Sequence, residues 1–252
     1  MSELNNNKNN ASFGYKKVSE TEKVSLVDDV FTSVAKKYDL MNDLMSFGLH
    51  RFWKKYFLFC SNIKKGDKVL DLAAGTGDIT KLISKAVGEN GIVISCDINY
   101  SMLYKGRDNL IDRGILKNVS YVQSDALSLS FEENSFNHVT IAFGLRNTAN
   151  INKALKSIYE ILKPGGSLQI LEFSKAEEII EKPYNIFLNN FIPKLGKYVA
   201  KDEDSYKYLA ESIATHPSQR ELIKLMENNG FKNCKYNNLS FGVVSIHKGH
   251  KL

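Results

Sequence analysis

Short apolar runs alternate with longer stretches of three-to-four-residue periodicity through the middle of the chain. The runs are rich in Val, Ile, Leu and Phe, which is typical of buried strands. They predict strands at Lys68–Leu72, Ile92–Asp97, Val119–Gln123, Phe136–Phe143 and Ser167–Phe173. The stretches between them predict helices at Ile79–Val87, Ser101–Arg113 and Ile151–Leu162. Strands separated by helices favour an α/β fold with a mostly parallel sheet and helices on both faces.

The N-terminal part of the chain has a different pattern. Residues 1–12 include an Asn-rich polar stretch without an apolar core, which predicts a disordered leader and not a secretory signal. Apolar side chains in Glu22–Tyr38 recur in steps of three and four, so this segment predicts an amphipathic helix. The aromatic-rich segment Tyr38–Phe59 follows. Residues 13–62 are therefore expected to form a helical cap that lies across a cofactor cleft.

The C-terminal third begins with a turn signal. Lys163-Pro164-Gly165-Gly166 predicts a turn that ends one helix and opens the fifth strand. Glu177–Ala214 is expected to be a helical insertion over the substrate site. Ser218-Gln219-Arg220-Glu221 has the pattern of a capping box and predicts the start of a further helix.

Two last strands are predicted near Phe231–Tyr236 and Gly242–His247. The link between them is short, which predicts an antiparallel hairpin at the end of a seven-stranded sheet. The chain shows neither an internal repeat nor a linker. We therefore expect one domain over residues 13–252.

Composition narrows the class of protein. No apolar run of the 252 residues approaches the ~18 that a membrane span needs. The three cysteines are far apart and odd in number, so they predict neither a disulfide framework nor a zinc site, and they favour a reducing cytoplasm. The net charge of +6 allows a polyanionic partner, but the lysines are scattered, which favours an ordinary solvated surface over a nucleic-acid site.

A glycine turn follows the first predicted strand of the sheet. Asp71 ends the apolar run, and Gly75-Thr76-Gly77 then allows the backbone to approach a ligand closely. A dinucleotide fingerprint would place a third glycine at position 80, where this chain has Thr80. The turn therefore argues against an NAD oxidoreductase, although alone it does not identify the ligand.

Acids at three successive strand ends indicate the ligand. Asp97 is placed to bind both ribose hydroxyls, and Asp125 with Ala126 to read the adenine edge. Asp71 is placed to order a ligand amino group directly or through water. Three carboxylates repel phosphate but suit the sulfonium and ammonium of S-adenosylmethionine. Each acid taken alone is better explained as a helix cap or turn residue, and only the three together favour the cofactor.

The exit of the fourth predicted strand of the sheet bears on the methyl acceptor. Methylases of base amino groups carry Asn/Asp-Pro-Pro-aromatic at this place. This chain reads Ala142-Phe143-Gly144-Leu145-Arg146-Asn147, and none of its prolines is adjacent to another. The segment argues against transfer to an exocyclic amine.

Several longer segments closely resemble the ubiquinone/menaquinone biosynthesis C-methyltransferase family. The resemblance runs from about Phe13 to the C-terminus and rests on Tyr38–Trp53, Leu162–Gly166 continuing to Leu171–Ser174, Phe143–Asn147, Asp204–Ile213 and Gly242–His247. Two positions depart from the family pattern. Glu160 stands where Arg is usual, and Ala142 stands where Ser is frequent, which removes one hydrogen-bonding group near the cofactor.

The resemblance implies a Rossmann-like class I methyltransferase that uses S-adenosylmethionine and no metal. It implies cofactor contacts at Thr76, Asp97, Asp125 and Ala126, to which the turn adds Asp71, Gly75 and Gly77. The implied reaction methylates a ring carbon of a prenylated quinol, converting demethylmenaquinol to menaquinol or a methoxy-polyprenyl-benzoquinol to its methylated product.

Such chemistry needs two groups: one that stabilises a phenolate, and a base that removes the proton of the hydroxyl. Arg146 is a candidate for the first role and His50 for the second. The alternatives are a structural ion pair for Arg146 and a hydrogen-bonded scaffold histidine for His50. Tyr38, Asp39 and Asn147 are candidates for orienting the quinol. His216 is a weaker catalytic candidate.

A set of aromatic residues is a candidate lining for the prenyl tail, with core packing as the alternative reading: Trp53, Tyr56, Phe57, Phe59, Tyr184, Phe187 and Phe191. Because the tail resides in the bilayer, we expect a cytoplasmic protein that associates peripherally with the inner membrane. Other quinone-pathway enzymes and a second copy of the chain are further candidate partners, and nucleic acid is not. Competing hypotheses are an RNA or protein methyltransferase and a non-catalytic scaffold of a quinone complex.

Overall fold

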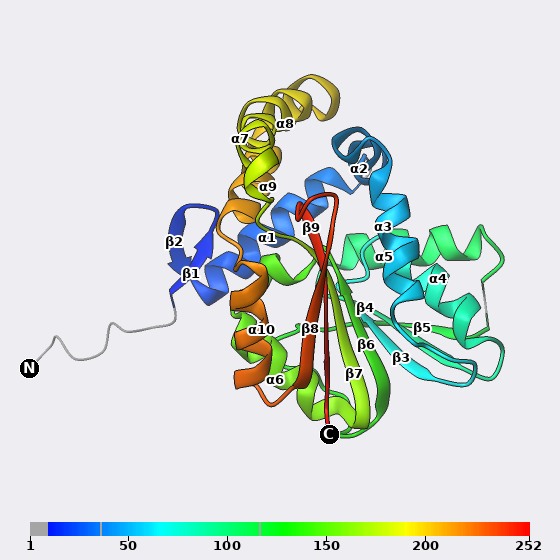
Figure 1. Cartoon of the computed structure of the whole chain (residues 1–252). Helices are drawn as coiled ribbons and strands as arrows, with labels where there is room; N and C mark the ends of the chain where they lie inside the picture. The colour runs from blue at the N-terminus through cyan, green and yellow to red at the C-terminus, as the bar shows by residue number, and fades with distance from the viewer. Residues whose placement is uncertain (1–9, 36, 116) are drawn as a thin grey trace, which may run out of the picture.

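A seven-stranded sheet forms the centre of the computed structural model, which describes residues 10–35, 37–115 and 117–252 (Figure 1). The strands follow the order β5-β4-β3-β6-β7-β9-β8. They are β3 (Lys68–Leu72), β4 (Ile92–Asp97), β5 (Val119–Gln123), β6 (Phe136–Ala142), β7 (Leu162–Phe173), β8 (Lys232–Leu239) and β9 (Val244–His250). Strands β3 to β7 thus lie where the apolar runs predict them.

The direction of the strands changes at one edge of the sheet. Strands β3 to β7 pair in parallel, whereas β9 pairs antiparallel with both β7 and β8. The predicted C-terminal hairpin is therefore confirmed, and its second strand lies inside the sheet. The β7–β9 register runs from Ser167 opposite His250 to Phe173 opposite Val244.

Helices cover both faces of the sheet, as the alternation of strands and helices predicts. The helices of the sheet region are α4 (Asp78–Val87), α5 (Tyr100–Ile111), α6 (Ile151–Ile161) and α10 (Gln219–Asn228). Successive strand residues point to opposite faces, so Leu70 packs in the cluster with α6 and α10, and Val69 packs in the cluster with α4.

The predicted turn Lys163–Gly166 lies within β7. Phe136 pairs with Leu162 and His138 with Ser167, so the four residues between bulge out opposite Asn137. Gly165 takes a φ of 82°, a left-handed conformation that glycine adopts without strain. The helix α6 does end just before this strand, as predicted. The predicted turn, however, is a bulge within β7 and not a link in front of it.

The N-terminal cap differs from its prediction in two respects: its amphipathic helix is broken into two helices, and a small hairpin precedes it. The amphipathic segment Glu22–Tyr38 is two helices, α1 (Glu20–Val34) and the start of α2 (Tyr38–Ser46). The Lys37 N–H donates to the Val34 carbonyl at 2.9 Å, which closes α1 with a tight turn. Met41 of α2 then packs with Val34 and with residues far along the chain, so tertiary packing overrides a continuous helical period.

A small hairpin precedes α1 and was not predicted. Strand β1 (Asn10–Phe13) pairs antiparallel with β2 (Lys16–Ser19), so residues 10–12 belong to a strand, not to the expected leader. Both strands have only four residues, too few for an apolar period to be visible in the sequence. Residues 1–9 of the predicted leader lie outside the described residues.

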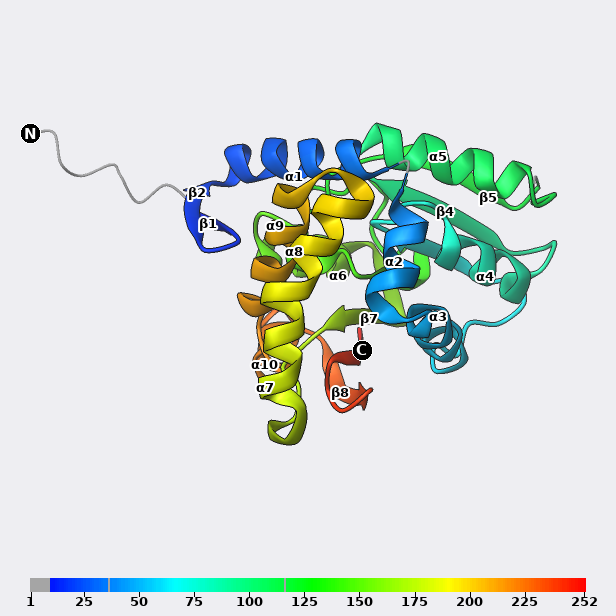
Figure 2. The same ribbon diagram turned by 90° about the horizontal axis from the view of Figure 1, so that it is seen from above.

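The segment Glu177–Ala214 is mostly helical, as predicted. It contains α7 (Glu178–Ile186), the π-helix η2 (Phe187–Phe191), α8 (Ile192–Leu195), the π-helix η3 (Gly196–Ala200) and α9 (Glu203–Ala214). Pro193 cannot donate to the carbonyl four residues back, which favours the wider turn of η2 before it. Figures 1 and 2 show α8 next to α2 at one end of the molecule, where α2 continues into α3 (Leu49–Phe59).

Candidate active site

Two cavities open at the carboxyl ends of the parallel strands, where open α/β sheets bind ligands. The larger holds about 1310 Å³ of space and the smaller about 770 Å³, in each case including the mouth. They share six lining residues: Phe31, Ala73, Gly75, Ala142, Phe143 and Asn147. A ligand in one cavity therefore borders a ligand in the other.

The smaller cavity contains the acid at the end of β4. Asp97 accepts hydrogen bonds from the backbone N–H groups of Gly75 at 2.8 Å and of Asn99 at 2.9 Å. Burial raises the pKa of Asp97 to about 6, although these two donors act in the opposite direction. Asp125 and Ala126 line the same cavity, and the Asp125 carboxylate accepts from the Leu127 N–H at 2.9 Å. The structure thus brings the predicted Asp97, Asp125, Ala126 and Gly75 together.

Thr76 and Asp71 line the larger cavity, and Gly77 lines neither. Thr76 donates to the Asp39 carboxylate of α2 at 2.9 Å, so the glycine turn is tied to the helical cap. Asp71 accepts from Thr80 at 2.6 Å and from Thr140 at 3.0 Å. Burial raises the pKa of Asp71 to about 7.

The backbone around the shared wall is unusual. Ala73 and Phe143 have φ values of 55° and 58°, in the left-handed region that non-glycine residues rarely adopt. A Cβ on Gly144 would lie 2.4 Å from the Cβ of Ala73, so only glycine allows the ends of β3 and β6 to approach. A Cβ on Gly106 of α5 would similarly lie 2.6 Å from the Gly75 carbonyl oxygen.

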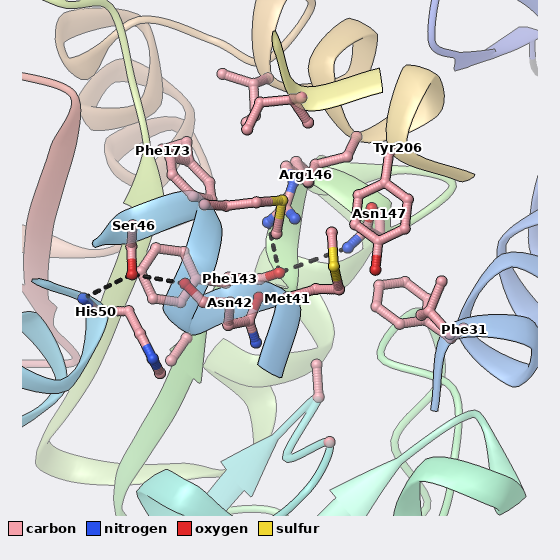
Figure 3. A pocket seen from close by; sticks show the side chains of 18 of the residues that line it. Phe31, Met41, Asn42, Ser46, His50, Phe143, Arg146, Asn147, Phe173 and Tyr206 are labelled. Carbon is pink, nitrogen blue, oxygen red and sulfur yellow. Dashed lines mark hydrogen bonds between the residues drawn. The ribbon is translucent and has the colours of Figure 1, made fainter. Parts of the chain in front are cut away.

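Arg146 lies in the wall of the larger cavity and is paired. Its Nη1 donates to Glu172 at 2.7 Å, and its backbone N–H donates to the second oxygen of the same carboxylate at 3.2 Å. Figure 3 shows Arg146 and Asn147 converging on the carbonyl oxygen of Phe143. The structural ion pair considered for Arg146 is therefore present. The arginine also lines the cavity, and its buried Nε has no hydrogen-bond partner among the residues that the structure describes.

Two tyrosines add hydroxyls to the same region. Tyr208 donates to the Asn147 side-chain oxygen at 3.1 Å. Tyr184 lines the cavity, and its buried hydroxyl has no hydrogen-bond partner within the described part of the chain. Burial raises the pKa of Tyr184, while the nearby Arg146 charge lowers it. Tyr184 therefore offers a neutral donor to a ligand.

His50 lines the larger cavity from α3. Its Nε2 lies 2.8 Å from Asp43 Oδ1, while the buried Nδ1 has no partner among the described residues. Arg51 also donates to Asp43, which fixes the carboxylate. Burial lowers the pKa of His50, so the ring is neutral near pH 7. With Asp43 bound to Nε2, the other ring nitrogen, Nδ1, is suited to accepting a proton.

The remaining candidates have different positions. Tyr38 begins α2, but its side chain lies outside the described residues. His216 is buried without lining either cavity, and burial lowers its pKa to about 4. Trp53, Tyr184 and Phe187 of the aromatic set line the larger cavity, whereas Phe57 is fully buried in the core and Phe59 is 81% exposed.

Sequence reasoning missed three groups of this site. Glu172 was read only as part of a resemblance, yet it holds Arg146. Asp43 has the same relation to His50, and the Tyr184 hydroxyl was read as part of an apolar lining. A seven-residue spacing between Asp43 and His50 within one helical cap was the available signal for the second of these.

The sheet order with its reversed strand β9, the glycine turn after β3 and the acid at the end of β4 define a Rossmann-like class I S-adenosylmethionine-dependent methyltransferase. The model of the ubiE/COQ5 methyltransferase family matches residues 16–251, so the chain belongs to this family. The family resemblance and the fold class expected from the sequence are confirmed.

Curated relatives agree over nearly the whole chain. A protein of Idiomarina loihiensis named ubiquinone/menaquinone biosynthesis C-methyltransferase UbiE is 53% identical over 98% of this chain and 99% of its own length. A protein of the same name from Pseudoalteromonas translucida is 55% identical over 95% and 96%. Among solved structures, a SAM-dependent methyltransferase from Aquifex aeolicus covers 94% of this chain and all of its own, with a TM-score of 0.57 and 17% identity, which shows the shared fold.

Proposed function

We propose that this protein transfers a methyl group from S-adenosylmethionine to a ring carbon of a prenylated quinol in menaquinone or ubiquinone biosynthesis. The observation that carries the proposal is the pair of adjoining cavities. One is lined by Asp97 and Asp125, and the other is larger and lined by apolar side chains together with Arg146 and His50. A donor site and an acceptor site that share a wall suit direct transfer between two bound molecules.

The smaller cavity has groups that match the donor. S-adenosylmethionine supplies the methyl group when it is bound. We assign the ribose hydroxyls to Asp97 and the adenine edge to Asp125 and Ala126, all of which line this cavity. Gly75, with a φ of 55°, lets the backbone come close, and Thr76 and Asp71 face the amino-acid end from the larger cavity. Gly77 supports the turn as the N-cap of α4.

The quinol ring is assigned to the part of the larger cavity near Arg146. An aromatic carbon becomes a strong nucleophile when a neighbouring hydroxyl loses its proton. Arg146, Asn147 and Tyr184 all line this cavity and would stabilise the resulting oxyanion by charge and hydrogen bonds. Because a guanidinium stays protonated and has no acceptor, Arg146 cannot remove the proton, and we assign it to stabilisation. Glu172 holds the guanidinium in place through their ion pair.

His50 is the proposed base. Asp43 at 2.8 Å holds Nε2 as the donor, so Nδ1 carries the lone pair that accepts the hydroxyl proton. The lowered pKa of His50 keeps this nitrogen unprotonated at neutral pH. The outcome of proton transfer is an imidazolium beside Asp43, which the carboxylate stabilises.

The prenyl tail is assigned to the apolar part of the larger cavity, between α2 and the α7–η3 segment. Met41, Leu188 and Ile192 line it there. The structure contains, within the described residues, no helix long and apolar enough to cross a bilayer. We propose a cytoplasmic protein that contacts the inner membrane peripherally and meets other quinone-pathway enzymes there. A metal-free reaction and a possible second copy of the chain stay predictions.

The direct test supplies the purified protein with isotopically labelled S-adenosylmethionine and a short-tailed demethylmenaquinol. The expected product is the quinol with one added methyl group, identified by mass spectrometry, with the label on the ring carbon. Benzoquinol and total RNA serve as competing acceptors. Label in RNA without label in either quinol would contradict the proposal and support the nucleic-acid alternative.

A further inference from the structure

Four large apolar side chains on the helical segments that line the larger cavity are exposed to solvent. Phe47 is 79% exposed, Ile186 63%, Phe191 48% and Tyr198 79%. We call these four residues the apolar rim. They come from the two helical segments that lie side by side at one end of the molecule in Figures 1 and 2, α2–α3 and α7–η3.

The apolar rim is continuous with the cavity. The ring of Phe187, which lines the cavity, lies 6.0 Å from that of Phe47 and 5.2 Å from that of Phe191, centroid to centroid. Phe47 belongs to one segment and Phe187 to the other, so the two segments meet at these rings. An apolar chain that leaves the cavity beside this contact meets Phe187 inside and the exposed rings of Phe47 and Phe191 outside.

The same two segments are basic. Residues 178–201 carry four lysines against two glutamates, and residues 37–59 carry four basic against two acidic side chains. Lys182, Lys194 and Lys201 are exposed. Exposed aromatic and aliphatic side chains flanked by lysines are the composition of surfaces that enter the headgroup region of anionic bilayers.

We infer that the apolar rim inserts into the surface of an anionic lipid bilayer and that the quinol enters the larger cavity from the membrane, between α2 and η2. The inference rests on the proposed function, because it is the prenylated acceptor that requires such a passage. It adds the face of the molecule, its orientation on the bilayer and the route of entry.

A second copy of the chain is the main alternative occupant of the rim. A two-fold dimer through this face would bring two net-positive segments together, and like charges repel. It would also place a protein surface, not lipid, at the entrance to the cavity. The charge of the segments therefore favours an anionic bilayer.

The test compares the full chain with a rim variant that combines Phe47→Asn and Ile186→Gln. Asn tolerates the left-handed φ of 50° at position 47, and Gln is a good helix former at position 186. The matched control combines Tyr104→Gln and Ile111→Gln, which removes two exposed apolar side chains from α5. Flotation with vesicles of phosphatidylglycerol and phosphatidylethanolamine is compared with flotation with phosphatidylcholine vesicles, and size-exclusion chromatography gives the oligomeric state.

We expect the wild type and the control to float with the anionic vesicles and the rim variant to bind at least about tenfold more weakly. With long-tailed quinol in vesicles, kcat/KM of the rim variant should fall about tenfold, while its activity on short-tailed quinol in solution equals that of the wild type. Equal vesicle binding by all three proteins would overturn the inference, as would a wild-type dimer that the rim variant dissociates. If the wild type methylates neither quinol, the proposed function fails. The vesicle experiment then still shows whether the apolar rim binds the bilayer.

Discussion

At the scale of single residues, the two cavities place the same demand on protonation, since each needs a group in its deprotonated form. Asp97 serves a hydroxyl-rich ligand when it is ionised, and its pKa is raised to about 6. His50 accepts a proton only when it is neutral, and its pKa is lowered. Both conditions are met at neutral pH, and both are lost in sufficiently acidic solution. The same acidification therefore weakens donor binding and stops catalysis, by separable routes.

The affinity for S-adenosylmethionine should fall in acid because Asp97 becomes protonated. We expect binding to weaken about tenfold for one pH unit below the pKa of about 6. Isothermal titration calorimetry at a series of pH values measures it. Asp97→Asn should bind weakly throughout and lack this part of the pH dependence. A wild-type affinity that is constant down to pH about 5 would contradict the role of the Asp97 carboxylate.

The role of His50 predicts a loss of rate and of a titration. At saturating S-adenosylmethionine, His50→Gln should reduce kcat/KM for the quinol by roughly 10²–10⁴ and remove the acid limb of its pH profile, because no neutral imidazole remains to accept the proton. His138 forms a similar pair with Asp67 at 3.2 Å, remote from the cavities, so His138→Gln is the matched control. If both variants retain the acid limb, His50 is a scaffold residue.

At the scale of elements, the glycine turn depends on α5, which is not the next helix in sequence. Gly106 of α5 lies against the Gly75 carbonyl, and Asn109 of the same helix donates to the Thr76 carbonyl at 3.1 Å. The helix thus holds the turn from behind while the ligand approaches from the front. The shape of the donor site is set by two elements together.

Gly106→Ala should push α5 away from the turn, since its Cβ would lie 2.6 Å from the Gly75 carbonyl oxygen. We expect a loss of roughly 1–3 kcal/mol in the free energy of unfolding and weaker binding of S-adenosylmethionine. Urea denaturation and calorimetry measure the two effects. Lys105→Ala, at an exposed position of α5, should change stability by less than about 0.5 kcal/mol. An unchanged Gly106→Ala protein would show that the contact is not tight.

The sequence predicts elements well where one period extends over a whole element. The five parallel strands and their helices agree with the structure because burial enforces their periods. The break between α1 and α2 was missed because both sides of it continue one apolar spacing. Asp97 could be placed from its spacing in sequence after the glycine turn. Glu172 could not be paired with Arg146 from the sequence, because the two meet only through the pairing of β6 with β7.

At the scale of the whole molecule, buried titratable groups shape the response to acid. Burial lowers the pKa of both His216 and His247 to about 4. Between about pH 6.5 and about pH 4, these two histidines bind protons in the unfolded chain but not in the folded chain. They therefore favour unfolding as the pH falls. Asp71 and Asp97 have raised pKa values and act in the opposite direction over this range.

His216→Gln should therefore flatten the acid loss of stability relative to the wild type. The wild-type contribution of this residue reaches about 3 kcal/mol at pH 4, if the unfolded pKa is 6.5. Urea denaturation of both proteins from neutral pH down to pH about 4 measures the difference between their slopes. Identical slopes would mean that His216 titrates in the folded protein as it does in the unfolded chain.

The position of β9 has a consequence for synthesis of the protein. This strand is the last of the sheet to be translated, yet it lies between β7 and β8. Until it has emerged from the ribosome, β7 presents an unpaired edge, and β8 has no neighbour to which it can bind. The nascent chain therefore carries an unpaired strand edge from the completion of β7 until β9 emerges, and chaperones that shield such edges should matter more for its yield than for that of a protein whose sheet grows from one side.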